Sequence, residues 1–159
     1  MTVSSNQIIY ELKKRLTPFL NIKEFSSNPG IYAIGFNGKD FPFPIEGNIV
    51  TKGDIIYIGK TEKSQKSRDA QTHFKSGKTG SSTLRRSLGA ILIDTLDLKP
   101  IPRSQNETRM RDYKFIKECE QQLTDWMIKN LSLSFFDFLK GKRLLRDLEK
   151  EIIIKFNPI

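Results

Sequence analysis

The sequence predicts an α/β fold of the α+β kind, in which a small, mostly antiparallel sheet of three strands is flanked by helices. Three short runs of apolar, β-branched and aromatic residues have the composition of strands, at residues 31–36, 54–58 and 131–138. Segments with apolar residues at helical spacing precede the first strand, separate the second from the third, and close the chain. Strands in this order can pair as antiparallel neighbours, with the helices packed on their sheet.

The first third of the chain is predicted to contain one helix before its two strands. Residues 6–20 repeat apolar side chains near helical spacing, and Ser5 or Asn6 can cap the helix that they form. Pro18 is expected to end or bend this helix, because proline lacks the N–H that a helix interior needs. A loop rich in glycine, proline and phenylalanine, at residues 37–53, then joins the first strand to the second.

The later part of the chain is predicted to be mainly helical. Ser81 and Ser82 are N-cap candidates for the helix that follows them. Residues 102–111 are polar and are expected to form a loop. A second helix is predicted over residues 113–130, directly before the third strand, and a last helix over residues 143–156.

Length and composition indicate one domain with an anionic partner. The chain has 159 residues, enough for a single core, and we expect residues 1–159 to form one domain. Its formal net charge of +9 favours nucleic acid as the partner, with a membrane surface as the alternative. The chain has no apolar run of bilayer length and no signal-peptide pattern, so we expect a cytoplasmic protein. Cys119 is the only cysteine, which excludes an intrachain disulfide and a cysteine-based zinc site.

Two tripeptides in the predicted strands carry the main functional signal. Gly-Ile-Tyr stands at residues 30–32, and Tyr-Ile-Gly stands at residues 57–59. Neighbouring strands can bring the two tyrosines and a glycine side by side. Four polar residues of types common in active sites come after the second tripeptide, namely Lys60, Arg68, His73 and Glu149.

This set resembles the GIY-YIG nuclease family, and the resemblance covers residues 30–158. It implies a metal-dependent enzyme that cuts a phosphodiester bond and carries a three-stranded sheet. It also implies that residues 30–159 form the catalytic core, with residues 1–29 as an N-terminal helical extension. The loop at residues 37–53 is longer than is usual between the two tripeptides of the family, and so departs from its pattern.

The last predicted helix gives an independent argument for Glu149. At about 100° per residue, Glu149 falls inside the apolar arc of this helix, whereas Glu151 falls at the edge of the arc or beyond it. A carboxylate on the core-facing side is costly unless a cation pairs with it. A salt bridge to a lysine or arginine and a bound metal would both meet this need. The resemblance favours the metal, because the family's metal-binding glutamate precedes a closing apolar stretch that ends in proline.

Basic charge is concentrated directly after the second tripeptide. Between residues 60 and 86, eight lysines and arginines stand against two acidic residues, which leaves a local net charge of +6. Such a run is usually a solvated face, but here it would surround the predicted site with a potential that attracts phosphate. Glycine at position 59 would let substrate approach the sheet closely. We therefore expect nucleic-acid contacts from Gly59, Lys63, Lys66, Lys75, Lys78, Arg85 and Arg86.

The resemblance also implies a catalytic arginine in a helix beyond the second tripeptide, with a His or Tyr four residues later. Arg68 fits the first part of this pattern. His73 follows Arg68 by five residues, which would put the two side chains about 140° apart on an ideal helix. His73 is therefore either a site residue or a surface histidine. Arg85 or Arg86, beyond an insertion, is the alternative catalytic arginine.

Together these features predict a DNA endonuclease, with RNA as an alternative substrate. The resemblance implies that Glu149 holds a single Mg²⁺ or Mn²⁺ ion and that Tyr32 acts as general base. Tyr57 would hydrogen-bond the scissile phosphate, and Arg68 with Lys60 would stabilise the transition state. One alternative function is a nucleic-acid-binding module on the same fold that does not cut. Another is an adaptor for acidic proteins, which leaves the tyrosines and Glu149 unexplained.

Overall fold

The two tripeptides lie on paired strands of an antiparallel sheet. The computed structural model of the chain describes residues 4–42, 47, 49–104 and 112–158. It forms two compact units, one made of Met1–Arg68 together with Lys129–Ile159 and the other of Asp69–Ile128. The sheet with the tripeptides belongs to the first unit.

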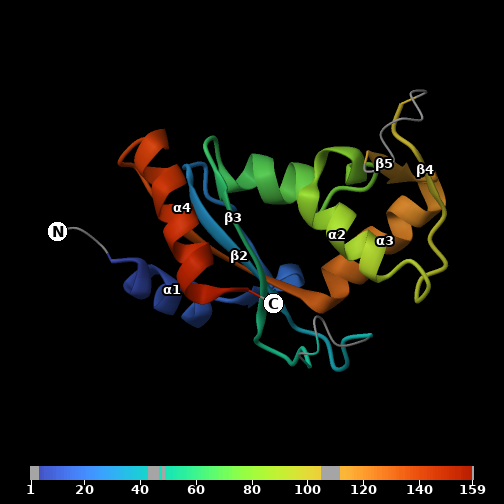
Figure 1. Cartoon of the computed structure of the whole chain (residues 1–159), viewed down its shortest axis with the longest axis horizontal. Coiled ribbons are helices and arrows are strands. Elements are labelled where there is room, and N and C mark those ends of the chain that lie inside the picture. The colour runs from blue at the N-terminus through green and yellow to red at the C-terminus, as the bar shows by residue number, and fades with distance from the viewer. Residues whose placement is uncertain (1–3, 43–46, 48, 105–111, 159) are drawn as a thin grey trace. The chain divides into compact units, whose positions relative to one another are not determined.

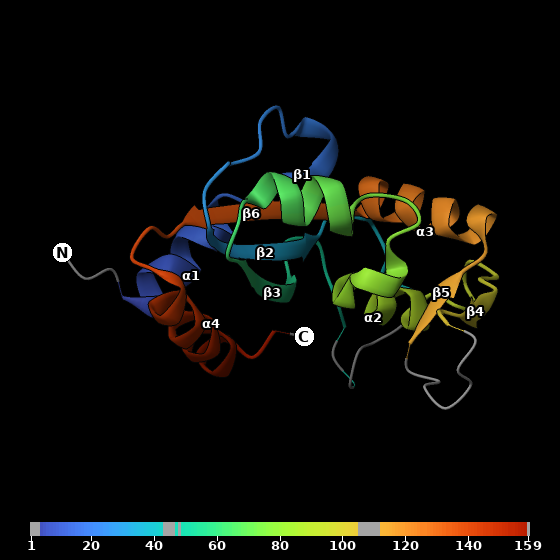
Figure 2. The ribbon, with the colours of Figure 1, turned by 90° about the horizontal axis from the view of Figure 1, so that it is seen from above.

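This sheet has four strands in the order β1-β6-β2-β3, and every neighbouring pair is antiparallel. β2 (Gly30–Phe36) pairs with β3 (Ile55–Thr61) on one side and with β6 (Leu131–Asp137) on the other. Figure 2 shows β6, β2 and β3 side by side. β1 (Thr17–Pro18) adds two residues at the edge of β6. β2 is buried along its whole length, which explains why its sequence is almost wholly apolar.

Two helices from opposite ends of the chain pack on one face of this sheet. α1 (Ser5–Lys14) begins at the N-cap Ser4, whose side chain accepts a hydrogen bond from the N–H of Gln7. α4 (Lys142–Phe156) packs against α1, β2 and β3 (Figure 1). The buried core that these elements share contains Ile8, Leu12, Ile31, Ala33, Ile55, Ile58, Leu145 and Ile152.

The second unit contains two helices and a small sheet of its own. α2 (Thr83–Ile91) begins at the N-cap Ser82, and most of α3 (Lys117–Asn130) also belongs to this unit. β4 (Pro100–Pro102) pairs with β5 (Tyr113–Phe115) in an antiparallel two-stranded sheet. Prolines fit such an edge strand because the strand needs few backbone donors.

The part of the chain that the structure describes also contains three short helices: η1 (Phe19–Asn21), η2 (Lys66–His73) and η3 (Thr79–Ser81). The first and last are single 3₁₀ turns, whereas η2 is a π-helix. At its end, the N–H of Phe74 donates to the carbonyl of Asp69, five residues earlier, at 2.9 Å. π-Helices are rare and occur frequently at functional sites.

The predicted fold class is confirmed, since three long antiparallel strands are flanked by helices. β1 is a fourth strand that the sequence did not predict. The first helix ends at Lys14 rather than at residue 20, because Thr17 and Pro18 pair with β6 instead. Its N-cap is Ser4, one residue before the predicted positions.

Two further boundaries need correction. The second strand begins at Ile55 and continues to Thr61, three residues beyond its predicted end. Residues 113–115 were predicted as the start of a helix but form β5. The predicted loops at 37–53 and 102–111 fall partly outside the described residues, at 43–46, 48 and 105–111. In the part of the chain that the structure describes, no helix has the length and apolar character needed to cross a membrane.

Candidate active site

The two tyrosines of the tripeptides lie on the same face of the sheet. Tyr32 of β2 is opposite Gly59 of β3, and Ile34 is opposite Tyr57. Residues two apart in a strand share a face, so both tyrosine side chains leave the sheet on one side. Their ring centroids are 6.1 Å apart, with 24° between the ring planes. Tyr32 is buried, and Tyr57 is half-buried, so the second ring is the more accessible to a substrate.

Gly59 provides the space in which the Tyr32 ring lies. A Cβ atom on Gly59 would meet the Tyr32 hydroxyl oxygen and would lie 2.6 Å from the ring carbon that bears it. Two non-bonded heavy atoms do not approach this closely without displacement. The prediction that Gly59 leaves space for substrate is therefore corrected, because the Tyr32 ring occupies that space.

Arg68 reaches the tyrosine pair from η2. Its guanidinium Nε donates a hydrogen bond to the Tyr32 hydroxyl at 3.4 Å, a long but directed contact. Arg68 is half-buried. The contact puts a permanent positive charge beside the Tyr32 hydroxyl. Arg68 is therefore the arginine that contacts the tyrosine pair.

Glu149 lies on the inner side of α4 and is half-buried. Burial raises the pKa of its carboxyl above the ordinary value, although the charge of Lys60, a hydrogen bond from the Lys60 backbone and the charge of Arg68 act in the opposite direction. The ionised carboxylate is therefore not fully compensated by its neighbours. A divalent cation at this position would supply the missing positive charge.

Glu151, two residues later, has a different environment. Its carboxylate accepts a hydrogen bond from the Ser5 hydroxyl at 2.7 Å and one from the Lys155 ammonium at 2.8 Å. The residue is exposed, and these partners lower the pKa of its carboxyl, Lys155 having the larger effect. The helical-wheel argument that separated Glu149 from Glu151 therefore agrees with the structure.

Glu62 is a charged residue beside the site that the sequence analysis did not single out. Its carboxylate accepts hydrogen bonds from the Lys60 ammonium at 3.1 Å and from Nε of Arg146 at 2.8 Å. Strand alternation offered a signal for the first contact, because residues 60 and 62 leave an extended chain on the same face. Nothing in the sequence indicated the second contact, which joins segments 84 residues apart.

The carboxyl of Glu149 is the candidate metal ligand. Across the described ranges, no three His, Cys, Asp or Glu side chains gather into a group that could hold a metal ion. Mg²⁺ does not need such a group, since it keeps several waters and is held by one or two carboxylates together with phosphate oxygens. A single half-buried carboxylate close to basic side chains thus fits Mg²⁺ or Mn²⁺, and does not fit a structural zinc site.

His73 and Arg85 are fully buried within the second unit. Nδ1 of His73 lies 2.7 Å from the hydroxyl of Ser82, the N-cap of α2, so the imidazole helps to order the start of that helix. A guanidinium nitrogen of Arg85 lies 2.8 Å from the carboxylate of Glu120, which is also buried. The predicted catalytic role of His73 and the predicted nucleic-acid contact of Arg85 are therefore corrected, because both side chains are buried and bonded to partners inside the second unit.

The remaining basic residues are accessible to different degrees. Arg86 is half-buried and donates a hydrogen bond to the carbonyl of Gly80 at 3.0 Å. Two of the predicted phosphate-binding lysines lie in the unit of the tyrosines and two in the second unit. All four are exposed: Lys63, Lys66, Lys75 and Lys78.

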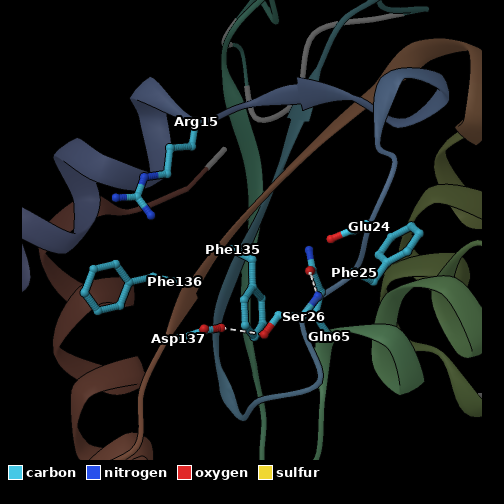
Figure 3. Close-up of a pocket in the computed structure, with 8 residues that line it drawn as sticks. All are labelled: Arg15, Glu24, Phe25, Ser26, Gln65, Phe135, Phe136 and Asp137. Atoms are coloured by element: carbon cyan, nitrogen blue, oxygen red, sulfur yellow. Dashed lines mark hydrogen bonds between the residues drawn. The ribbon is translucent and has the colours of Figure 1, made fainter.

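A pocket of about 550 Å³ lies along β6, apart from these residues. Figure 3 shows Phe135 between Phe136 on one side and Phe25 with Ser26 on the other. The Ser26 hydroxyl donates to Asp137 at 2.6 Å, which ties the loop before β2 to the end of β6. None of the predicted site residues lines this pocket. The candidate active site is instead the tyrosine pair with Arg68, together with Glu149, on which the charges of Lys60 and Arg68 act.

A known protein family matches this chain over a range that includes both tripeptides. The sequence profile described as the GIY-YIG catalytic domain matches residues 30–159, from the first residue of the first tripeptide past Glu149. No curated protein and no solved structure gives a match. A GIY-YIG catalytic domain implies a nuclease with a nucleic-acid substrate. Because the profile covers well over half of the chain, we conclude that this protein belongs to the GIY-YIG nuclease family.

Proposed function

We propose that this protein is a metal-dependent DNA endonuclease that hydrolyses phosphodiester bonds. One observation carries the proposal: four groups suited to this reaction, from β2, β3, η2 and α4, belong to one compact unit and act on one another. The Tyr32 hydroxyl accepts a hydrogen bond from Arg68, the Tyr57 ring stacks on Tyr32, and the charge of Arg68 acts on Glu149.

Each group has a distinct role in this proposal. Tyr32 acts as general base in its phenolate form, which the guanidinium of Arg68 stabilises, and it becomes a neutral phenol when it accepts the proton of the attacking water. Tyr57, the more exposed tyrosine, donates a hydrogen bond to the scissile phosphate. Arg68 also stabilises the additional negative charge of the transition state, together with Lys60.

Glu149 holds the metal ion in this proposal. Its half-buried carboxylate gains a compensating charge from the ion, and water with phosphate oxygens completes the coordination. Bound Mg²⁺ or Mn²⁺ would polarise the phosphate and neutralise charge on the leaving oxygen. One ion is sufficient for the single candidate carboxylate.

The exposed lysines favour DNA over a compact small substrate. Lys63 and Lys66 are exposed in the unit of the tyrosine pair and can neutralise phosphates of a polyanion, and Lys75 and Lys78 can do the same on the other unit. Such contacts position a nucleic-acid backbone without reading its sequence. We therefore expect weak sequence preference, with RNA as a second substrate to be tested against DNA.

A plasmid-nicking assay tests this function directly. The parent should convert supercoiled plasmid to nicked circles with Mg²⁺ and should not do so with excess EDTA. Glu149→Gln removes the proposed ligand without changing the size of the side chain and should abolish nicking. Glu151→Gln, on the same helix, should nick like the parent because Glu151 is exposed and pairs with Lys155.

Retained nicking by Glu149→Gln would show that the metal ligand is wrongly chosen. A parent that binds DNA tightly but leaves it intact at every metal concentration would identify a binding module that does not cut.

A further inference from the structure

Glu62, just beyond the end of β3, forms ion pairs with three basic side chains. Its carboxylate lies 3.1 Å from the Lys60 ammonium, 2.8 Å from the Arg146 guanidinium and 3.9 Å from the Lys142 ammonium. Hydrogen bonds from Arg146 and Lys60 lower the pKa of the Glu62 carboxyl to about 2, so the group stays ionised at neutral pH. Glu62 thereby connects the strand that carries Tyr57 to the helix that carries Glu149.

The charge of Lys60 acts on Glu149, and Arg146 shares a face of α4 with it. The backbone of Lys60 donates a hydrogen bond to the Glu149 carboxyl. Arg146 precedes Glu149 by three residues on α4, a spacing that puts both side chains on one face of a helix. Among the ion pairs of the described residues, however, both cations pair with Glu62 and neither pairs with Glu149.

Glu149 would attract these cations in the absence of Glu62. A half-buried carboxylate is stabilised by an opposite charge nearby, and Lys60 and Arg146 would then have no other acidic ion-pair partner among the described residues. An ammonium or guanidinium bound to Glu149 occupies oxygens that a divalent cation needs as ligands. Ion pairs with an exposed partner, such as those of Glu62 with Arg146 and Lys142, contribute little to folding. The proposed effect of Glu62 therefore concerns where the cations lie.

We propose that Glu62 is a positioning residue of the active site, which holds the Lys60 and Arg146 side chains away from Glu149 and so keeps that carboxylate available to a divalent cation. The proposal rests on the nuclease function given above. It explains why an acidic residue with three cationic neighbours stands at the start of the most basic stretch of the chain.

Binding of Mn²⁺ to the full chain tests this proposal without measuring cleavage. The concentration of free Mn²⁺ can be followed by its electron paramagnetic resonance signal. In Glu62→Gln, we expect the affinity for Mn²⁺ to fall about 10-fold, the lower end of the range for residues that orient metal ligands. Glu151→Gln makes the same change of charge on α4 and should bind Mn²⁺ like the parent. Thermal unfolding shows whether each variant is folded.

A double-mutant cycle with Arg146→Gln separates positioning from a simple loss of negative charge. Arg146→Gln alone should change the Mn²⁺ affinity little, because Glu62 already holds Arg146. In the Glu62→Gln background the same change should recover several-fold of the lost affinity, since it removes one competing cation. Strictly additive effects, or parental affinity in Glu62→Gln, would overturn the positioning role while leaving the nuclease function standing. Equal Mn²⁺ binding by the parent and Glu149→Gln would overturn both proposals.

Discussion

The ring of Tyr32 fills the space that any side chain larger than hydrogen on Gly59 would need. The two residues face each other in the register of β2 and β3, so the tyrosine of one tripeptide packs on the glycine of the other. This relationship explains why the two tripeptides work as a pair. Gly59 in the second strand allows Tyr32 to stack beside Tyr57 and to accept a hydrogen bond from Arg68.

Gly59→Ala should therefore disturb the active site, because the new side chain would displace Tyr32. The added methyl group must displace the Tyr32 ring, and overpacking of this kind costs about 1–3 kcal/mol in the free energy of unfolding. Cleavage should fall more than stability does, because the Tyr32 hydroxyl moves away from Arg68. Gly80→Ala is the control, since its new Cβ would lie 3.2 Å from an atom of the flexible Arg103 side chain. Urea unfolding and nicking rates measure both effects, and unchanged nicking by Gly59→Ala would contradict the packing argument.

Tyr32→Phe should separate catalysis from packing. The ring stays, and the loss of one hydrogen bond with Arg68 should lower the free energy of unfolding by about 0.5–1.5 kcal/mol. Nicking should fall by about 10²–10⁴, the usual contribution of a positioned acid or base. Tyr10→Phe is the matched control because Tyr10 is 62% exposed on α1. If Tyr32→Phe cuts at the parental rate, the tyrosine is a packing residue and the proposed base lies elsewhere.

Glu149 and Glu151 should have opposite effects on stability as pH changes. The pKa of the Glu149 carboxyl in the folded protein is raised above its ordinary value of 4.5. At low pH this group is protonated in both the folded and the unfolded state. At higher pH it must ionise in the folded protein, which lowers the free energy of unfolding. Metal-free Glu149→Gln should therefore be more stable than the parent at pH 7, and this advantage should fade as the pH falls toward 4. The pKa of Glu151 is lowered, so Glu151→Gln should be less stable than the parent at pH 7, and this deficit should also fade in acid. Urea unfolding in EDTA between pH 4 and pH 8 measures both, and equal signs for the two variants would contradict the assignment.

Arg85→Ala should destabilise the protein without acting through nucleic acid. The change leaves the buried Glu120 carboxylate without its cation, and breaking a buried ion pair in this way costs about 3–5 kcal/mol. Lys78→Ala removes an exposed cation from the same unit and should leave stability within about 0.5 kcal/mol of the parent. Denaturant unfolding measures the difference. Parental stability combined with weakened DNA binding in Arg85→Ala would restore the nucleic-acid contact that the structure contradicts.

The sequence predicted the fold where local pattern and tertiary packing agree. β2, β3 and β6 are runs of apolar and β-branched residues, and α4 has a clear apolar arc, so each pattern had one interpretation. Residues 113–115 were wrongly predicted as helix because their aromatic side chains stand at helical spacing from the apolar residues of α3. Their pairing with Pro100–Pro102 depends on a partner that no local pattern identifies.

The candidate site was predictable to the extent that its residues belong to short motifs. The neighbouring strands of the two tyrosines followed from the tripeptides, and the inward position of Glu149 followed from helical periodicity. The burial of Arg85 could not be predicted, since its partner Glu120 lies 35 residues away and both residue types are usually exposed. The ion pairs of Glu62 with α4 were equally hidden, because they depend on how a distant helix packs beside β3.

The division of the first unit between two distant stretches of sequence has a consequence for how the protein is made. Ribosomes release the N-terminal part of a chain first, so Tyr32, Tyr57 and Arg68 emerge before any residue of Lys129–Ile159. At that stage β2 lacks its partner β6, and the phosphate-binding groups have no carboxylate from α4. The sheet that carries the tyrosine pair is therefore complete only after β6 has been translated, and Glu149 joins this unit last, with α4.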